Sequence, residues 1–247
     1  MVHRLFFASI FVGALLGAGH PALAQTPPPD AAAAAAAVAE VRQTTDTAWK
    51  DVQAFDKTGG KPGAPDHPAL KWHETLWTYR EQHPGTEAAA RATADGIRLL
   101  VRGQFWDQAH ARMAAVGVDD PAWERLSAAV YEEGSTRKDF AYTIATLSKV
   151  AATTTSATIK SATLLDIGRA QRRQGNVDAA KESFEASRSA APGSASSEEA
   201  AGLLYEIAHL SVGLPAPAFS TKARNGKTVD LAALHGRAVV LVFWATT

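Results

Sequence analysis

Three histidines and a glutamate in the first half of the chain have side chains that could bind a metal ion. His67, His73 and His83 lie near one another in the sequence, and Glu74 follows the second of them. Imidazole and carboxylate groups bind zinc when their spacing brings them to one helical face or one turn. The separations between these histidines place no pair on one face at that spacing. We therefore predict surface or packing roles for the histidines and no metal site.

Other residue types that perform chemistry lack the patterns that chemistry requires. The chain has no cysteine, which excludes a disulfide, a thiolate metal site and a cysteine nucleophile within these 247 residues. No serine stands in the Gly-x-Ser-x-Gly pattern that exposes a nucleophile at a strand-to-helix turn. The glycine-rich run at 59–63 lacks the spacing of a phosphate-binding loop. The sequence thus predicts no catalytic, cofactor-binding or metal-binding residue.

Overall charge and composition exclude two classes of partner. The chain has 25 Lys+Arg against 25 Asp+Glu and a pI near 7.1. A neutral balance leaves no basic excess to neutralise nucleic-acid phosphates or an anionic membrane surface. Hydrophobic residues make up 46% of the chain, which is typical of a packed protein rather than a disordered one.

Four tryptophans, Trp72, Trp77, Trp106 and Trp123, fall within the region that we predict to be helical. Large aromatic side chains supply much of the buried area of protein cores, so we expect them to fill helix interfaces. The alternative is a ligand groove lined by these rings.

The first 30 residues have the layout of an exported protein. A positive start with Arg4, an apolar run at 5–16 and the small-x-small sequence at 22–24 form a secretory signal peptide at 1–24, cleaved after Ala24. An uncleaved membrane anchor is the alternative, but it needs about 20 apolar residues. A proline-rich spacer follows at 25–30, and no cysteine is placed for a lipid anchor. We expect a periplasmic or secreted protein that leaves the membrane after cleavage.

Residues 31–210 are expected to form a helical module, and from Asp66 to about Leu210 the periodicity is helical almost throughout. Asp30 is a suitable N-cap for a first helix that runs from the alanines at 31–37 through Trp49 and Phe55. A partly frayed low-complexity tether is the alternative for 30–37. Short polar breaks are expected at Gly117, at 134–135 and at 153–156. Helices joined by such short loops pair antiparallel, so the fold class predicted here is mainly α, an array of helix pairs. Further helices are expected near 70–80, 87–100, 104–116, 121–132, 139–152 and in 161–192.

The stretch at 161–192 resembles a tetratricopeptide repeat. Leu164, Ile167 and Gly168 lie on its first helix, Gly175-Asn176 forms the turn, Ala180 and Phe184 lie on its second helix, and Pro192 ends it. Gly168 and Ala180 are small where the helices cross, and Phe184 fills the gap between them. Gln171 and Ser187 depart from the pattern, and residues 103–109 are a weaker echo of the turn. The resemblance implies a surface that binds a peptide or protein partner.

The pattern changes after His209. Two prolines in 211–219 break the helix, and Asn225-Gly226 between two short segments predicts a β-hairpin. Residues 231–234 are expected to form one helical turn that Gly236 closes. Residues 238–244 are seven apolar residues in a row, a pattern typical of a strand buried on both faces of a sheet.

Residues 211–247 resemble the start of a thioredoxin-like domain of the TlpA group in the redoxin superfamily. The matching positions are Val212-Gly213, Pro215-Ala216-Pro217, Phe219, Asn225-Gly226-Lys227, Leu231, Leu234, Gly236 and 239–246, whereas Ala218 replaces a common aspartate. The resemblance implies an incomplete α/β domain here, formed by a β-hairpin and one buried strand. It also implies a Cys-x-x-Cys pair just after Thr247, so that the chain as given lacks the catalytic residues.

From these features we expect an exported thiol-disulfide oxidoreductase of the TlpA type that also has a helical protein-interaction module. Its partners would be a protein or peptide on the helices and a redox partner of the complete domain. Two alternatives stay open: a non-enzymatic periplasmic helical-repeat scaffold, and a peroxiredoxin-like antioxidant protein. The sequence around Trp244 disfavours the peroxiredoxin-like alternative, because the reactive cysteine of peroxiredoxins normally follows a proline-containing loop.

Overall fold

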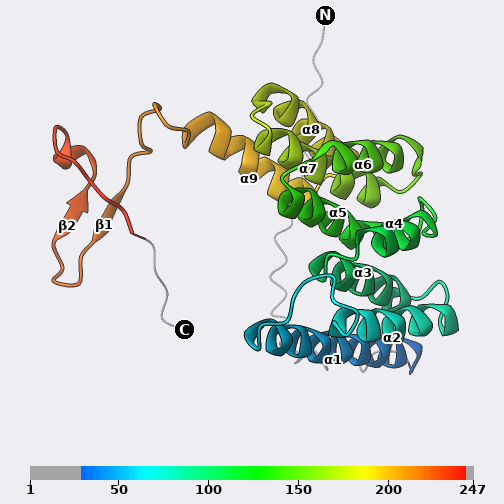
Figure 1. Ribbon diagram of the computed structural model, residues 1–247. Coiled ribbons are helices and arrows are strands. Elements are labelled where there is room, and N and C mark those ends of the chain that lie inside the picture. The colour runs from blue at the N-terminus through cyan, green and yellow to red at the C-terminus, as the bar shows by residue number, and fades with distance from the viewer. Residues whose placement is uncertain (1–28, 243–247) are drawn as a thin grey trace, which may run out of the picture.

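The computed structural model describes residues 29–242, and within them the chain is mainly helical with a small antiparallel sheet (Figure 1). This confirms the predicted fold class. The predicted signal peptide, most of the spacer and residues 243–247 lie outside the described residues. The elements are α1 (Pro29–Lys57), α2 (Pro68–Gln82), α3 (Glu87–Arg102), α4 (Trp106–Ala114), α5 (Trp123–Arg137), α6 (Ala141–Thr153), α7 (Ala157–Arg173), α8 (Val177–Ala190), α9 (Ala195–His209), β1 (Ser220–Lys222), β2 (Thr228–Asp230) and the 3-10 turn η1 (Ala232–Leu234).

The helices form a stack in which the odd-numbered ones make a continuous row. The backbones of α1, α3, α5, α7 and α9 each approach the next odd-numbered helix closely, whereas the even-numbered helices of the described chain touch one another only through side chains. The even-numbered helices therefore lie outside this row, each against an odd-numbered neighbour (Figure 1). Within 29–242, none of the helices combines the length and the apolar character needed to cross a membrane.

Several helices begin where a side chain accepts a hydrogen bond from the first turn. Thr86, Ser156 and Ser194 cap α3, α7 and α9 in this way, and His67 caps α2 through Nδ1, 3.1 Å from the Ala69 amide. Such caps satisfy amide groups that have no partner inside the helix. The starts of these four helices are thus determined locally by the sequence.

One predicted helix break is wrong. Gly134 and Ser135 lie inside α5, which continues to Arg137 and ends where Lys138 adopts a left-handed conformation with φ 57°. A Cβ on Gly134 would lie 2.7 Å from the ring of Phe140. The glycine is needed because the start of α6 crosses α5 closely at this point, and it does not interrupt the helix.

Apolar side chains of the helices gather in three clusters along the stack. The largest, the α3–α7 cluster, joins α3, α4, α5, α6 and α7 and also includes Trp77 of α2; its members Ile97, Leu126 and Leu147 are fully buried. A second joins α1, α2 and α3, and a third joins α7, α8 and α9 around Phe184. Each helix buries its apolar face against two or more neighbours, as expected for a repeat array.

The α7–α8 pair has the packing that its sequence predicts. The Phe184 ring lies against Gly168, where a Cβ would be 2.5 Å from the nearest ring atom. The hydroxyl of Ser161 donates to the carbonyl of Ser187 at 2.9 Å, and the hydroxyl of Ser187 donates to the carbonyl of Ser161 at 2.8 Å. Ser187, one of the departures from the repeat pattern, thus forms part of a reciprocal buried link between the two helices.

The predicted hairpin is present, but its turn differs from the expected one. Ser220 pairs with Asp230 and Lys222 with Thr228, so five residues connect the strands. Gly226 has a positive φ of 79°, whereas Asn225 does not. The Asn225 side chain instead accepts a hydrogen bond from the Lys227 amide at 3.1 Å. The Asn-Gly pair therefore makes a longer turn than the two-residue type, and η1 follows as predicted.

The described part of the predicted buried strand forms no strand. Residues 238–242 belong to no helix or strand, and their apolar side chains face solvent, with Val240 85% and Val242 74% exposed. Residues 243 and 244 lie outside the described part. A central strand is buried only when strands on both sides and covering helices are present. In 211–242 the only sheet is β1–β2, which contacts none of the helices α1–α9.

The close contact between α7 and α8 predicts the effect of one methyl group. Gly168→Ala should destabilise the protein by about 1–3 kcal/mol, because the new Cβ overlaps the buried Phe184 ring and the two helices must separate. The measurement is the free energy of unfolding from urea titrations of the purified chain.

Gly202→Ala is the matched control. Gly202 lies inside α9, and a Cβ there would meet no atom within 4 Å. This substitution should stabilise the protein by about 0.5–1 kcal/mol, since alanine loses less backbone entropy in a helix. Equal effects of the two substitutions would contradict the close packing at Gly168.

Candidate functional site

His67 is buried at the start of α2, where it has a structural role. Its ring lies between Phe55 and Phe105, with centroids 4.8 and 5.6 Å away, and its Nδ1 caps the helix. Burial lowers the pKa of His67 below its ordinary value; Asp56 and Asp66 oppose this shift and Arg102 adds to it. The ring is therefore kept neutral, which the cap requires because Nδ1 must accept a hydrogen bond.

His73 is also buried, within α2. Its Nε2 accepts a hydrogen bond from Nε of Arg112 at 3.0 Å, which assigns the ring proton to Nδ1 beside Gly96. Burial lowers the pKa of His73, and the nearby Arg112 cation lowers it further, whereas the Gly96 backbone and Glu74 raise it. The contact ties α2 to α4 through a neutral imidazole.

The three histidines do not converge. His83 follows α2 and stacks on Tyr79 at 4.4 Å, while His67 and His73 occupy separate buried positions. Among residues 29–242, no three His, Asp or Glu side chains are grouped so that they could hold a metal ion. The packing role predicted for His67 and His73 is confirmed by their burial and contacts.

The tryptophans divide between core and surface. Trp77 and Trp123 are buried, and both belong to the α3–α7 cluster. The Trp77 ring lies between the guanidinium groups of Arg80 and Arg112, 4.6 and 4.2 Å from its centroid, which adds cation–π attraction to its burial. The predicted interface role is confirmed for these two, whereas Trp72 lines an open hollow.

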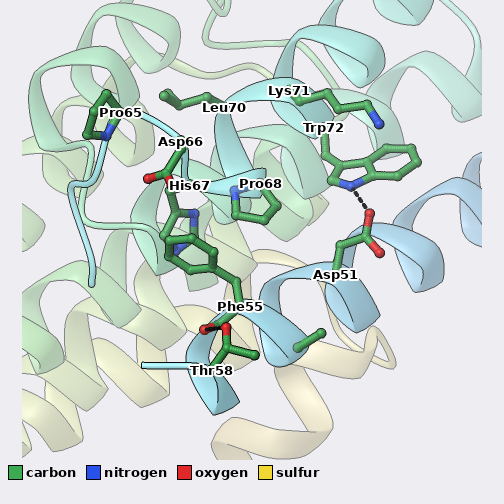
Figure 2. Close-up of a pocket in the computed structure, with 11 residues that line it drawn as sticks. Asp51, Phe55, Thr58, Pro65, Asp66, His67, Pro68, Leu70, Lys71 and Trp72 are labelled. Carbon is green, nitrogen blue, oxygen red and sulfur yellow. Dashed lines mark hydrogen bonds between the residues drawn. The ribbon is translucent and has the colours of Figure 1, made fainter. Parts of the chain in front are cut away.

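A hollow of about 610 Å³ lies between the end of α1 and the start of α2 (Figure 2). We call it the aromatic groove; its lining includes Asp51, Phe55, Asp66, His67, Lys71 and Trp72. The Trp72 indole donates to Asp51 at 2.8 Å, and the Lys71 ammonium lies 4.8 Å from the Trp72 ring centroid. The Trp72 indole N–H and the accepting Nδ1 of His67, both in the lining of this groove, thus already have hydrogen-bond partners within the protein.

A second hollow, about 490 Å³, crosses the row of odd-numbered helices near its C-terminal end. We call it the arginine groove; it is lined by Tyr131 of α5, Arg169, Arg172 and Arg173 of α7, and Leu203 of α9. Arg169 pairs with Asp166 at 2.7 Å and with Glu199, and Arg172 pairs with Glu206. Arg173 has no carboxylate within ion-pair distance in the described chain and only donates to the Tyr131 hydroxyl at 3.4 Å.

Ion pairs in this groove set the charge that a ligand meets. The Arg172 hydrogen bonds lower the pKa of Glu206, so Glu206 stays ionised and neutralises Arg172. Asp166 is buried, which raises the pKa of its carboxyl despite the bond to Arg169. Arg173 therefore supplies the uncompensated positive charge, between a tyrosine hydroxyl and the apolar Leu203. Such a surface can bind a segment that carries a carboxylate next to an apolar side chain.

Sequence reasoning missed the arginine groove, although a signal was present. Arg169, Arg172 and Arg173 follow the spacing of one helical face on the helix that was identified as a repeat helix. Whether these arginines line a groove depends on which side chains of α5 and α9 lie beside them. Those side chains are far apart in the sequence, between residues 131 and 206. The two grooves present charged, aromatic and apolar groups that can bind a ligand.

The buried histidines predict a loss of stability in acid. The unfolded chain binds protons at histidine near pH 6.5, about the ordinary value, whereas His67 and His73 in the folded chain do not until the pH is lower. Their contribution to stability is thus complete above that pH and is lost as the pH falls below it. Urea titrations at a series of pH values between about 7.5 and 5 should show the decline.

His67→Asn provides the test of this cause. Asparagine can also cap the helix through its side-chain oxygen but has no group that titrates in this range. The pH dependence of the free energy of unfolding should therefore become shallower. A slope equal to that of the unchanged protein would rule out His67 as a contributor.

Comparison with known proteins adds no family or relative to these observations. The chain matches no protein family, no curated protein and no solved structure.

Proposed function

We propose that the protein is an exported thiol-disulfide oxidoreductase of the TlpA type, in which residues 31–210 bind a protein partner and residues 211–247 begin a thioredoxin-like domain. The resemblance in the sequence of 211–247 is the origin of this proposal. The hairpin and the exposed apolar segment that follows it give it structural support.

The exposed apolar segment carries the proposal. Val239, Val240, Leu241 and Val242 are all exposed, although β-branched and leucine side chains favour a sheet interior. Exposed apolar strands that lack partners promote aggregation, so a natural protein covers or pairs them. The helices leave this segment uncovered, since all four of these side chains are exposed. Further strands of a thioredoxin-like sheet would pair with this segment.

A shallow hollow beside the hairpin supports the same interpretation. Pro215, Ala216, Leu231, Leu234 and Val239 line it, and its volume is about 460 Å³. These residues come from both sides of the hairpin and lie close together without forming a buried core. This is the arrangement expected when the side chains that fill a core come from other elements of the same domain.

The chemistry of the proposed domain resides in a Cys-x-x-Cys pair at a helix N-terminus, expected after Thr247. There the helix dipole and free amide groups lower the pKa of the first cysteine, whose thiolate attacks a substrate disulfide. A mixed disulfide forms and the second substrate sulfur leaves as a thiolate. The second cysteine then attacks the mixed disulfide, so the substrate gains two electrons and the protein dithiol is oxidised.

The test is the coding sequence that follows the Thr247 codon and the protein that it encodes. We expect a Cys-x-x-Cys within a few codons, and we expect the encoded protein to reduce insulin with dithiothreitol as electron donor. Replacement of the first cysteine by serine should abolish this activity. The 247-residue chain is the matched control, since it has no cysteine to exchange. A reading frame that continues without the cysteine pair would overturn the proposal.

The arginine groove favours the partner-binding role of the helices. It spans α5, α7 and α9, and α9 leads directly into residues 211–242 (Figure 1). A protein substrate held there by an acidic or C-terminal carboxylate would lie at the end of the array from which the proposed redox domain extends. The same observation supports the non-enzymatic alternative, in which the helices act as a binding module alone.

Arg173→Ala separates binding from chemistry in the complete protein. The Michaelis constant for insulin should rise by about tenfold, because a charge-assisted contact contributes about 1.5–3 kcal/mol, while turnover of oxidised glutathione stays the same. Arg188→Ala is the control, since Arg188 is exposed on α8 and has no ion pair in the described chain. Equal constants for insulin in both variants would contradict partner binding in the arginine groove.

A further inference from the structure

Tyr131 places its hydroxyl beside the one arginine of the arginine groove that has no carboxylate partner in the described chain. Nε of Arg173 donates to this hydroxyl at 3.4 Å, which is long for an N–H···O bond. The Tyr131 ring stacks on the buried ring of Phe140, with centroids 5.6 Å apart. Packing against Phe140 therefore fixes the position of the phenol without help from Arg173.

This pair keeps donors that a ligand can use. The Tyr131 hydroxyl accepts from Arg173, and its own proton has no acceptor among residues 29–242. The Nη groups of Arg173 also donate to no residue of the described chain. A guanidinium carries five N–H donors in a planar fork that matches a carboxylate, and a phenol adds one O–H donor. Tyr131 and Arg173 thus offer adjacent donors and a single positive charge.

The other two arginines of the groove are already neutralised. Both Nη atoms of Arg172 donate to Glu206, at 3.2 and 2.7 Å, and Arg169 pairs with Asp166 and Glu199. The side chains of Glu199 and Glu206 are 50% and 45% exposed, so their negative charges lie at the surface beside the groove. Phosphorylated residues are usually bound by clusters of free arginines. A second negative charge on a ligand would meet these carboxylates with no further free arginine to balance it, so the groove favours a single negative charge.

The groove has the length of a short extended segment. It crosses α5, α7 and α9, which lie side by side in the stack (Figure 1). Packed helix axes are about 8–10 Å apart, so three helices span about 16–20 Å, or about five or six residues of extended chain. Leu203 lies on α9 and Tyr131 on α5, with α7 between them, so an apolar contact is present on the far side of Arg173.

We propose that Tyr131 and Arg173 together bind the side-chain carboxylate of a glutamate or aspartate in an extended segment of the protein partner, and that the groove discriminates against a phosphorylated residue at that position. Arg173 pairs with the carboxylate, and the Tyr131 hydroxyl donates to it while it still accepts from Arg173. An apolar residue two positions from the acidic one lies on the same side of an extended chain and packs on Leu203. This inference rests on the partner-binding role proposed above and names the chemistry of the partner.

A capped hexapeptide, acetyl-Ala-Ala-Glu-Ala-Leu-Ala-amide, is a suitable probe, because the glutamate side chain carries its only charge. Its matched controls have glutamine or phosphoserine in place of the glutamate. In NMR titrations of the purified 247-residue chain, the glutamate peptide should bind about tenfold more tightly than the glutamine peptide. The phosphoserine peptide should bind more weakly than the glutamate peptide. Equal dissociation constants for the glutamate and glutamine peptides, or phosphoserine binding at least as tight as glutamate binding, would overturn the proposal.

Tyr131→Phe tests the contribution of the hydroxyl. The variant keeps the ring that stacks on Phe140 and should fold normally, while binding of the glutamate peptide should weaken about fivefold because one hydrogen bond to the carboxylate is lost. Tyr205→Phe is the matched control, since Tyr205 is exposed on α9 and does not line the groove. It should leave the dissociation constant unchanged. An unchanged constant in Tyr131→Phe, or an equal loss in both variants, contradicts a bond from Tyr131 to the ligand.

These titrations involve no thiol, so the carboxylate site and the redox function can fail separately. Selective binding of the glutamate peptide, with no cysteine pair encoded after Thr247, would leave the helices as a binding module alone. Insulin reduction by the complete protein without selective peptide binding would overturn only the carboxylate site.

Discussion

The contact between each odd-numbered helix and the next is the interaction on which the rest of the structure depends. No helix of the array can bury its apolar face alone, so α3, α5 and α7 are stable only between their neighbours. At the edge of this row, polar pairs cross from helix to helix: Arg102 to Asp56, Arg98 to Glu132, and Arg172 to Glu206. Exposed ion pairs contribute little energy each, but they fix the register in which the helices stack.

That row also decides where binding surfaces can form. The side chains around the arginine groove come from helices that are distant in sequence: Tyr131 lies on α5, Arg173 on α7 and Leu203 on α9. The deciding feature of this groove is a cation without a carboxylate partner in the described chain. Helix packing places Arg173 there, and the missing partner is the basis of its proposed ligand.

Local signals were sufficient to predict most helices, because caps, prolines and apolar spacing act within a few residues. The contact of Phe184 with Gly168 was also predictable, since the helices that carry them are adjacent in the chain. Gly134 was misread as a break because a glycine that permits a close crossing looks the same in sequence as one that ends a helix. The Asn225-Gly226 turn was placed correctly, but its length depends on strand register, which two residues do not encode.

The segment after the hairpin shows why the apolar pattern of a sequence and the burial of its side chains can disagree. Residues 238–242 have the composition of a central strand, yet a strand of that kind is defined by its neighbours as much as by its own side chains. The helical array buries its apolar side chains within itself, in three clusters. The side chains of Val240 and Val242 are exposed, and no residue of 29–237 covers them. The helices thus bury their apolar side chains among themselves, whereas the segment after the hairpin leaves its apolar side chains exposed. The proposed thioredoxin-like domain would account for this difference, because its further strands would pair with that segment.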